Sequence, residues 1–268
     1  MNFKNTLVIS DLDGTLIDRN FTVSERNREA IERFKRGGGH FAVATGRSLQ
    51  AGAQYFAAVA PNNPSVILNG TVIYDFSSQK ILWSKPMERE SAVECVRLIR
   101  ERFPDTGIEV YDTTELRVVH SNEYIVKHLT REGIEINDDD ITVFGGHPLC
   151  KALIADEADV IRDIIAFMGT FEHKDVRFVP SNLNYLEMLP ACANKGCALK
   201  ELISICGFSI DQVYAIGDYY NDVELLAAAG FAVMPENAPD DLKQHADLVV
   251  CSCDDGAVAD LIEYIEQK

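Results

Sequence analysis

The sequence predicts an α/β protein in which a parallel sheet forms one domain and a second, α+β domain is inserted into it. Two observations support this prediction. Short, almost continuous apolar runs recur toward both ends of the chain, and segments with helical periodicity separate most of them. In the middle of the chain, apolar and polar residues alternate instead. Continuous runs are typical of strands buried on both faces of a parallel sheet, whereas alternation is typical of a sheet with one solvated face.

Six apolar runs are the expected strands of the parallel sheet. Turn signals bound each of them, as expected for short buried strands. Because strands alternate with helices along the chain, the class is α/β. The six runs are TLVIS (6–10), HFAVAT (40–45), SVILN (65–69), QVYAIGD (212–218), FAVM (231–234) and DLVV (247–250).

Two segments between these runs show helix signals at both ends. Ser24 is expected to cap the N-terminus of a helix that stops at the glycines 37–39. The segment ALKELISICG (198–207) repeats its apolar residues at helical spacing and ends at Gly207. Both helices are expected to cover the parallel sheet.

The middle of the chain is expected to form a hairpin and then the inserted domain. After the turn signal Asn69-Gly70, the segments TVIYD and KILWS are expected to pair as a hairpin. The pattern that follows contains the helices ESAVECVRLIRERF and EADVIRDIIAFM and the strands GIEVYD, ELRVVH, CKALIAD, DVRFVPS and YLEML. The predicted domains are therefore a core, 1–83 with 187–268, and an inserted α+β domain, 84–186.

Composition and charge narrow the class of function. A chain of 268 residues with 47% hydrophobic and 25% charged residues is typical of a globular protein with a sizeable core. The net charge of −17 argues against a nucleic-acid or anionic-membrane partner, because no basic stripe exists to neutralise phosphates. No apolar stretch is long enough for a secretory signal or a spanning helix. The seven cysteines, an odd number without paired zinc spacing, are expected to be buried free thiols in a reducing cytoplasm.

Polar side chains gather at the C-terminal ends of the expected parallel strands. Asp11 and Asp13 are two residues apart, so an extended chain would direct both carboxylates to one side. Like charges this close raise one another's pKa unless a cation lies between them. Ligands of open α/β sheets bind at these strand ends, so a cation-dependent site is expected there. Its candidate residues are Asp11, Asp13, Thr45, Gly46, Arg47, Asn69, Asp218, Asn221 and Asp222.

Four motifs in this order resemble those of the haloacid dehalogenase-like (HAD) phosphatases. They are DLDGTL (11–16), ATGR (44–47), ACANKG (191–196) and GDYYND (217–222). The insertion is similar to the large α/β cap of the Cof-type subfamily, whose members include sugar-phosphate phosphatases. The resemblance covers nearly the whole chain and implies a Rossmann-like core with an inserted cap. One departure is Pro235, where such proteins more often carry glycine.

The resemblance also implies a role for each site residue. Asp11 would be the nucleophile that forms an aspartyl phosphate, and Asp13 the general acid–base residue. Mg²⁺ would be held by the side chains of Asp11 and Asp218 and by the backbone carbonyl of Asp13. Asp222 would orient Lys195 or metal-bound water. The phosphate contacts implied are Leu12, Thr45, Gly46, Lys195 and Asn221.

Three of these residues have more than one possible role. Arg47 could contact substrate or pair with an acidic neighbour, and Asn69 could contact substrate or only shape its turn. Lys195 could be a solvated surface charge. The expected function is a magnesium-dependent phosphatase for a small phosphorylated metabolite. The alternatives are a phosphotransferase or phosphomutase, which shares the first half-reaction, and a non-catalytic phosphosugar-binding regulatory protein.

Overall fold

The computed structural model describes residues 3–134 and 147–268, which divide into two compact units. The first, called the core unit below, contains Met1–Arg47, Gly52–Trp83 and Asn194–Lys268. The second, called the cap unit, contains Ser48–Ala51 and Ser84–Ala193. The domain boundary expected between residues 186 and 187 falls inside strand β10 (Tyr185–Pro190) of the cap unit.

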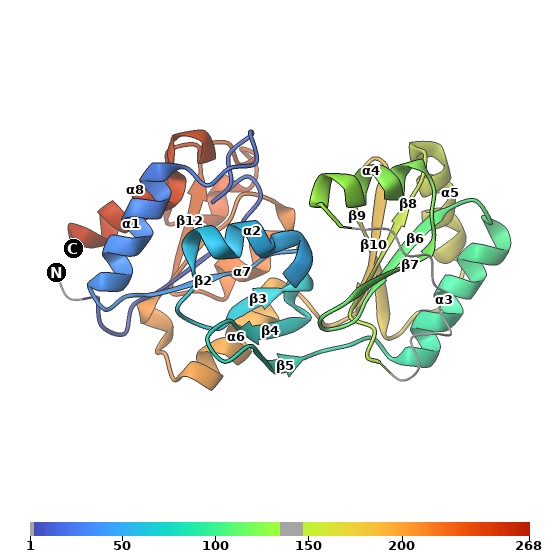
Figure 1. Ribbon diagram of the computed structural model, residues 1–268, viewed down its shortest axis with the longest axis horizontal. Coiled ribbons are helices and arrows are strands. Elements are labelled where there is room, and N and C mark those ends of the chain that lie inside the picture. Colours follow the sequence, from blue (N-terminus) through green and yellow to red (C-terminus); the bar gives the residue numbers. More distant parts are fainter. Residues whose placement is uncertain (1–2, 135–146) are drawn as a thin grey trace. The chain divides into compact units, whose positions relative to one another are not determined.

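A five-stranded parallel sheet, in the order β13-β12-β11-β1-β2, forms the centre of the core unit (Figure 1). All four residues of β1 are buried, as expected for a strand covered on both faces. The predicted α/β class is therefore confirmed. The strands are β1 (Leu7–Ser10), β2 (His40–Val43), β11 (Val213–Ile216), β12 (Phe231–Pro235) and β13 (Leu248–Val250).

One of the six strands predicted for this sheet lies in a different sheet. The run 65–69 supplies only β3 (Ser65–Ile67), which pairs antiparallel with β4 (Val72–Asp75) in a three-stranded sheet completed by β5 (Lys80–Ser84). An isolated parallel bridge between Ala44 and Val66 links β3 to the end of β2. The chain reverses at residues 68–70, so β3 is too short to extend along β2. The Asn-Gly signal thus joins β3 to β4.

Helices cover the parallel sheet. Helix α1 (Glu25–Arg36) begins where predicted, because the Ser24 side chain accepts a hydrogen bond from the backbone of Asn27, and it packs against α8 (Ala257–Glu266) (Figure 1). Helix α6 (Lys195–Cys206) ends at the left-handed Gly207, and it packs beside α7 (Val223–Ala227) in a cluster with apolar side chains of β1 and β11. Helix α2 (Leu49–Val59) follows β2.

The cap unit contains a five-stranded antiparallel sheet in the order β7-β6-β8-β10-β9. Helices α3 (Arg89–Arg102) and α5 (Ala158–Met168) pack in one apolar cluster with side chains of this sheet. Helix α4 (Glu123–Glu132) packs in another. The remaining strands are β6 (Gly107–Tyr111), β7 (Leu116–His120), β8 (Lys151–Ala155) and β9 (Val176–Asn182).

The cap sheet corrects the expectation of one solvated face. Every residue of β6 and β8 is buried, including Glu109 in the middle of β6. Glu109 accepts hydrogen bonds from the Tyr111 hydroxyl at 2.6 Å and lies 3.1 Å from Nδ1 of His128 on α4. At the centre of the sheet, polar side chains of the alternating pattern are therefore buried, and Glu109 has hydrogen-bond partners.

The cysteines are all free thiols, but not all are buried. Cys95, Cys150 and Cys253 are buried. Cys206 and Cys251 are half-buried and Cys192 and Cys197 are exposed, so the expectation of buried thiols is confirmed only for the first three. In the described part of the chain, no helix combines the length and the apolar character that crossing a bilayer requires.

Candidate active site

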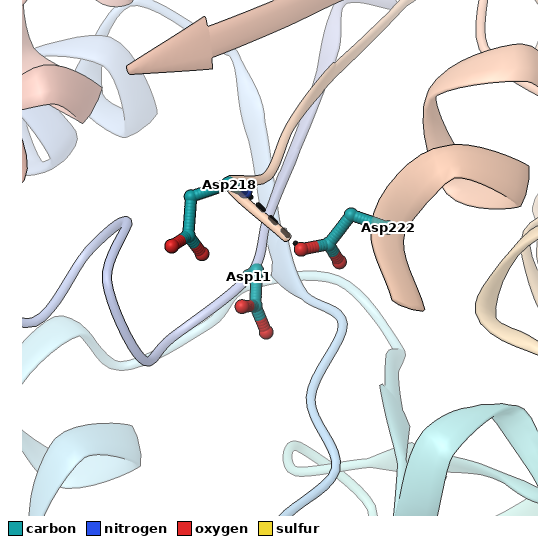
Figure 2. A group of neighbouring side chains, drawn as sticks. All are labelled: Asp11, Asp218 and Asp222. Atoms are coloured by element: carbon teal, nitrogen blue, oxygen red, sulfur yellow. Dashed lines mark hydrogen bonds between the residues drawn. The ribbon is translucent and has the colours of Figure 1, made fainter. Parts of the chain in front are cut away.

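Three aspartates meet where neighbouring parallel strands end. Asp11 follows β1, and its backbone N–H donates to the carbonyl of Ile216 at the end of β11 (2.9 Å), so Asp218 comes next to it. The short helical turn η4 (Tyr220–Asp222) then brings Asp222 back toward both. One carboxylate oxygen from each of the three lies within 4.8 Å of the others, and Figure 2 shows them converging.

The three aspartates carry more negative charge than the positive charge nearby neutralises. Burial raises the pKa of Asp11 well above its usual value, and repulsion from Asp222 adds to the effect while Lys195 opposes it. Burial, with repulsion from Asp222, raises the pKa of Asp218 to about 6. Two neighbouring carboxyl groups are therefore hard to ionise together unless a further cation binds.

The Lys195 ammonium lies inside this cluster of carboxylates. Lys195 is the first residue of α6 and only 1% exposed, so the reading as a surface charge is wrong. Its ammonium lies 2.7 Å from Oδ1 of Asp11 and 2.7 Å from Oδ1 of Asp222. Burial alone would lower the pKa of Lys195, but the two carboxylates together raise it above its usual value. The lysine therefore stays charged inside the site.

The oxygens of Asp222 already have partners within the chain. Oδ1 accepts from Lys195, and Oδ2 accepts the backbone N–H groups of Asp218 and Tyr219, both at 3.2 Å. Asp222 thus holds Lys195 in place, and through the bond to Asp218 drawn in Figure 2 it also holds the turn after β11. This leaves Asp11 and Asp218 as the carboxylates best placed to face a bound cation. Carboxylate oxygens are the ligands that Mg²⁺ prefers, and the surplus negative charge fits a divalent ion.

Asp13 does not join this group. Its side chain is 50% exposed, and Arg47 donates to both of its oxygens, from Nε at 2.8 Å and from Nη2 at 2.7 Å. Because β1 ends at Ser10, the alternation of an extended strand does not by itself set the direction of the Asp13 side chain. Repulsion from Asp13 raises the pKa of Asp11, but less than repulsion from Asp222 or Asp218 does. Arg47 also packs over the ring of Tyr55, 4.9 Å from its centroid. Of the two readings left open for Arg47, the pairing with an acidic neighbour is the one observed.

The candidate phosphate-binding residues lie at or near the same strand ends. Thr45 is fully buried after β2, where the Ala44 N–H bonds to Ser10 at 2.8 Å, so Thr45 and Asp11 leave neighbouring strands side by side. Leu12 is fully buried, and its carbonyl accepts N–H groups of the following turn. Asn221 is exposed within η4. Gly46 follows Thr45 directly, next to Asn69.

Two residues outside the predicted set support this site. The Thr15 hydroxyl donates to Oδ1 of Asp218 at 3.1 Å. The Asn237 amide donates to the Gly14 carbonyl at 2.9 Å and accepts from the Cys253 N–H at 2.9 Å. Thr15 could have been found as part of the motif DLDGTL. Asn237 lies in the loop after Pro235, and no spacing in the sequence connects it with Gly14.

The chain is similar to known proteins along nearly its whole length. The family model described as haloacid dehalogenase-like hydrolase matches residues 8–262. The chain is similar to a 5-amino-6-(5-phospho-D-ribitylamino)uracil phosphatase of Bacillus subtilis, with 27% identity over 95% of this chain and 96% of that protein. It is similar to a pyridoxal phosphate phosphatase of Escherichia coli, with 24% identity over 91% of this chain and 92% of that one. A haloacid dehalogenase-like hydrolase from Bacteroides thetaiotaomicron has a similar crystal structure, with a TM-score of 0.84, 26% identity and coverage of 97% and 99%.

Proposed function

The chain belongs to the haloacid dehalogenase-like hydrolase family, and on this basis we propose that it is a magnesium-dependent phosphatase that cleaves a small phosphorylated metabolite through an aspartyl phosphate. The observation that carries the proposal is the convergence of Asp11, Asp218 and Asp222 around the buried Lys195. Relatives named as phosphatases of pyridoxal phosphate and of a phosphoribitylaminouracil support the substrate class.

Asp11 is the nucleophile. One of its carboxylate oxygens attacks phosphorus, the bond from phosphorus to the leaving oxygen breaks, and an aspartyl phosphate forms. Asp11 attacks only when ionised, and its pKa is raised by burial and by neighbouring carboxylates. Lys195, 2.7 Å away, opposes that rise and favours the reactive carboxylate.

Asp11 and Asp218 would hold Mg²⁺, with the carbonyl of Asp13 as an expected third ligand. The chemistry that Mg²⁺ supplies when bound is neutralisation of the surplus carboxylate charge and polarisation of the phosphate. Lys195, Thr45, Gly46, the Leu12 backbone and Asn221 hold the phosphate oxygens, and preorganised donors of this kind stabilise the charge that develops during transfer.

Asp13 completes the reaction as general acid and base. It gives a proton to the leaving alkoxide in the first step and takes one from the attacking water in the second, which releases inorganic phosphate and restores Asp11. Arg47 donates to both oxygens of this carboxylate, so Asp13 must leave the pair and take up a proton before it acts as the acid in the first step.

The test is a panel of phosphate monoesters that includes p-nitrophenyl phosphate, pyridoxal phosphate and several sugar phosphates. We expect release of inorganic phosphate with Mg²⁺, none with a chelator, and little with Ca²⁺, which accepts looser coordination than Mg²⁺. Added glycerol separates hydrolysis from transfer, because a phosphotransferase would form glycerol phosphate. Turnover that persists in excess chelator would contradict the magnesium assignment, and glycerol phosphate as the main product would replace hydrolysis by transfer.

A further inference from the structure

The turn formed by residues 68–70, called the 68–70 turn below, is unusual in its backbone. Leu68, Asn69 and Gly70 have φ angles of 49°, 55° and 91°, so three consecutive residues are left-handed. Side chains with a Cβ disfavour this region, and a bulky residue such as leucine rarely adopts it. Asn69 is 8% exposed and Leu68 is 1% exposed, so the turn is surrounded by packed protein atoms and not by solvent. Strain of this kind persists only where the surrounding structure enforces it.

One side of the 68–70 turn holds the loop that carries Thr45 and Gly46. The Asn69 N–H donates to the Thr45 carbonyl at 3.0 Å, and the Leu68 N–H donates to the Arg47 carbonyl at 3.1 Å. The Asn69 side chain lies against Gly46, where a Cβ would be 2.8 Å from Oδ1 and 3.1 Å from Nδ2. The left-handed backbone of Asn69 thus directs its amide onto the residue expected to bind phosphate.

The other side of the turn meets the start of α6. A Cβ on Gly70 would lie 2.2 Å from the carbonyl carbon and oxygen of Asn194 and 2.7 Å from the nitrogen of Lys195. Asn194 caps α6 by accepting the Cys197 N–H at 2.7 Å, so this contact falls on the residues that fix the helix start. Lys195 in turn reaches Asp11 and Asp222. The 68–70 turn therefore contacts two site segments that are about 150 residues apart in the chain.

We propose that the 68–70 turn positions the phosphate-binding groups, with Asn69 fixing Gly46 and Gly70 fixing the start of α6 and so Lys195. This inference rests on the proposed function and deepens it. Asn69 and Gly70 are positioning residues, because they act through Gly46 and Lys195. The backbone is strained because three residues must contact both Gly46 and the start of α6.

The test separates positioning from stability. Asn69→Gly removes the amide and relieves the left-handed strain, while Gln79→Gly relieves equivalent strain (φ 55°) in the turn between β4 and β5 and is the matched control. Both variants should keep or slightly raise the melting temperature. Asn69→Gly should lower kcat/KM for p-nitrophenyl phosphate about 10- to 100-fold and raise the inhibition constant of inorganic phosphate in parallel, because small displacements of positioning groups cost this much. Gln79→Gly should change neither quantity.

Gly70→Ala tests the second contact, since its methyl group must displace Asn194 or Lys195. We expect a lower kcat together with weaker binding of inorganic phosphate by calorimetry in the presence of Mg²⁺.

Wild-type kinetics in Asn69→Gly, or losses of activity that match those of Gln79→Gly, would overturn the proposal. If the wild-type protein hydrolyses no ester, only the proposed function is contradicted, because the affinity for inorganic phosphate can still be measured in the same variants. If Asn69→Gly and Gly70→Ala leave that affinity unchanged, the positioning role of the 68–70 turn is wrong.

Discussion

The core unit and the cap unit both bury lysines and carboxylates, yet they use them differently. In the core, Lys195 lies between Asp11 and Asp222, and Asp218 adds a third carboxylate that it does not neutralise. In the cap, Lys151 pairs with Glu187 at 2.9 Å, and Glu109 has Tyr111 and His128 as partners. The core cluster keeps the pKa values of Asp11 and Asp218 raised.

This difference shows what distinguishes a candidate site from a polar interior. Burial of charge is common to both units, so burial alone does not identify a site. The core cluster combines burial with surplus charge of one sign, and it assembles at the ends of neighbouring parallel strands, where ligands bind in open α/β sheets.

The largest difference is expected between two buried carboxylates. Asp11→Asn should lower turnover at least about 10³-fold, because an amide is a poor nucleophile. Its melting temperature should not fall, since burial and repulsion already disfavour the charged form of Asp11. Glu109→Gln should instead retain turnover of p-nitrophenyl phosphate and lose about 1–3 kcal/mol of stability, because Tyr111 and His128 lose a charged partner. Steady-state kinetics and thermal melting measure both. Activity in Asp11→Asn would exclude the covalent route.

The two buried lysines form the next comparison. Lys195→Met should lower kcat for p-nitrophenyl phosphate on the order of 10²-fold, because a charged donor is removed from a desolvated phosphate site. Lys151→Met should leave that kcat unchanged and lower the free energy of unfolding by about 1–3 kcal/mol, since the half-buried Glu187 loses its lysine. Equal losses of activity in the two variants would mean that Lys195 acts only through stability.

Two left-handed glycines differ in what surrounds them. Gly14 has φ +74°, and a Cβ there would lie 2.4 Å from Oδ2 of Asp218. Gly133 has φ +68° at the end of α4, and no described atom lies within 4 Å of its Cβ position. Each change to alanine should cost about 1 kcal/mol of stability. Gly14→Ala should in addition weaken Mg²⁺ binding by displacing Asp218, which titration of activity against Mg²⁺ measures. An unchanged Mg²⁺ requirement would remove Asp218 from the cation site.

The smallest effect concerns two thiols. Burial raises the pKa of Cys95 in the cap to about 11, so at about pH 8 only about one molecule in 10³ carries the reactive thiolate. Cys197 on α6 is exposed. Brief treatment of the native protein with iodoacetamide should therefore modify Cys197 and spare Cys95, and Cys95 should react only as the pH approaches 11 or when the protein unfolds. Peptide mass spectrometry reads both. Rapid labelling of Cys95 in the native protein would contradict the packing of α3.

Local patterns in the sequence predicted the strands and half of the α-helices in the described part of the chain; α2, α4, α7 and α8 were not predicted. The Ser24 cap and the Gly207 end of α6 depend on residues a few positions apart, and the apolar runs of β1 and β11 depend on neighbours in the chain. The four motifs likewise located the residues that meet at the strand ends, because parallel strands bring their ends together by construction. The α/β class and the candidate site were therefore accessible from the sequence.

Only the tertiary structure decided which side chains are partners. The pairing of Asp13 with Arg47, the complete burial of Lys195, the bond from Asn237 to Gly14 and the departure of β3 from the parallel sheet all join or separate segments that are distant in the chain. Spacing along a sequence determines which residues share a face of one helix or strand. Contacts between distant segments depend on where each strand ends and on the backbone conformation of the turn that follows. At residues 68–70 the surrounding packing enforces a left-handed turn.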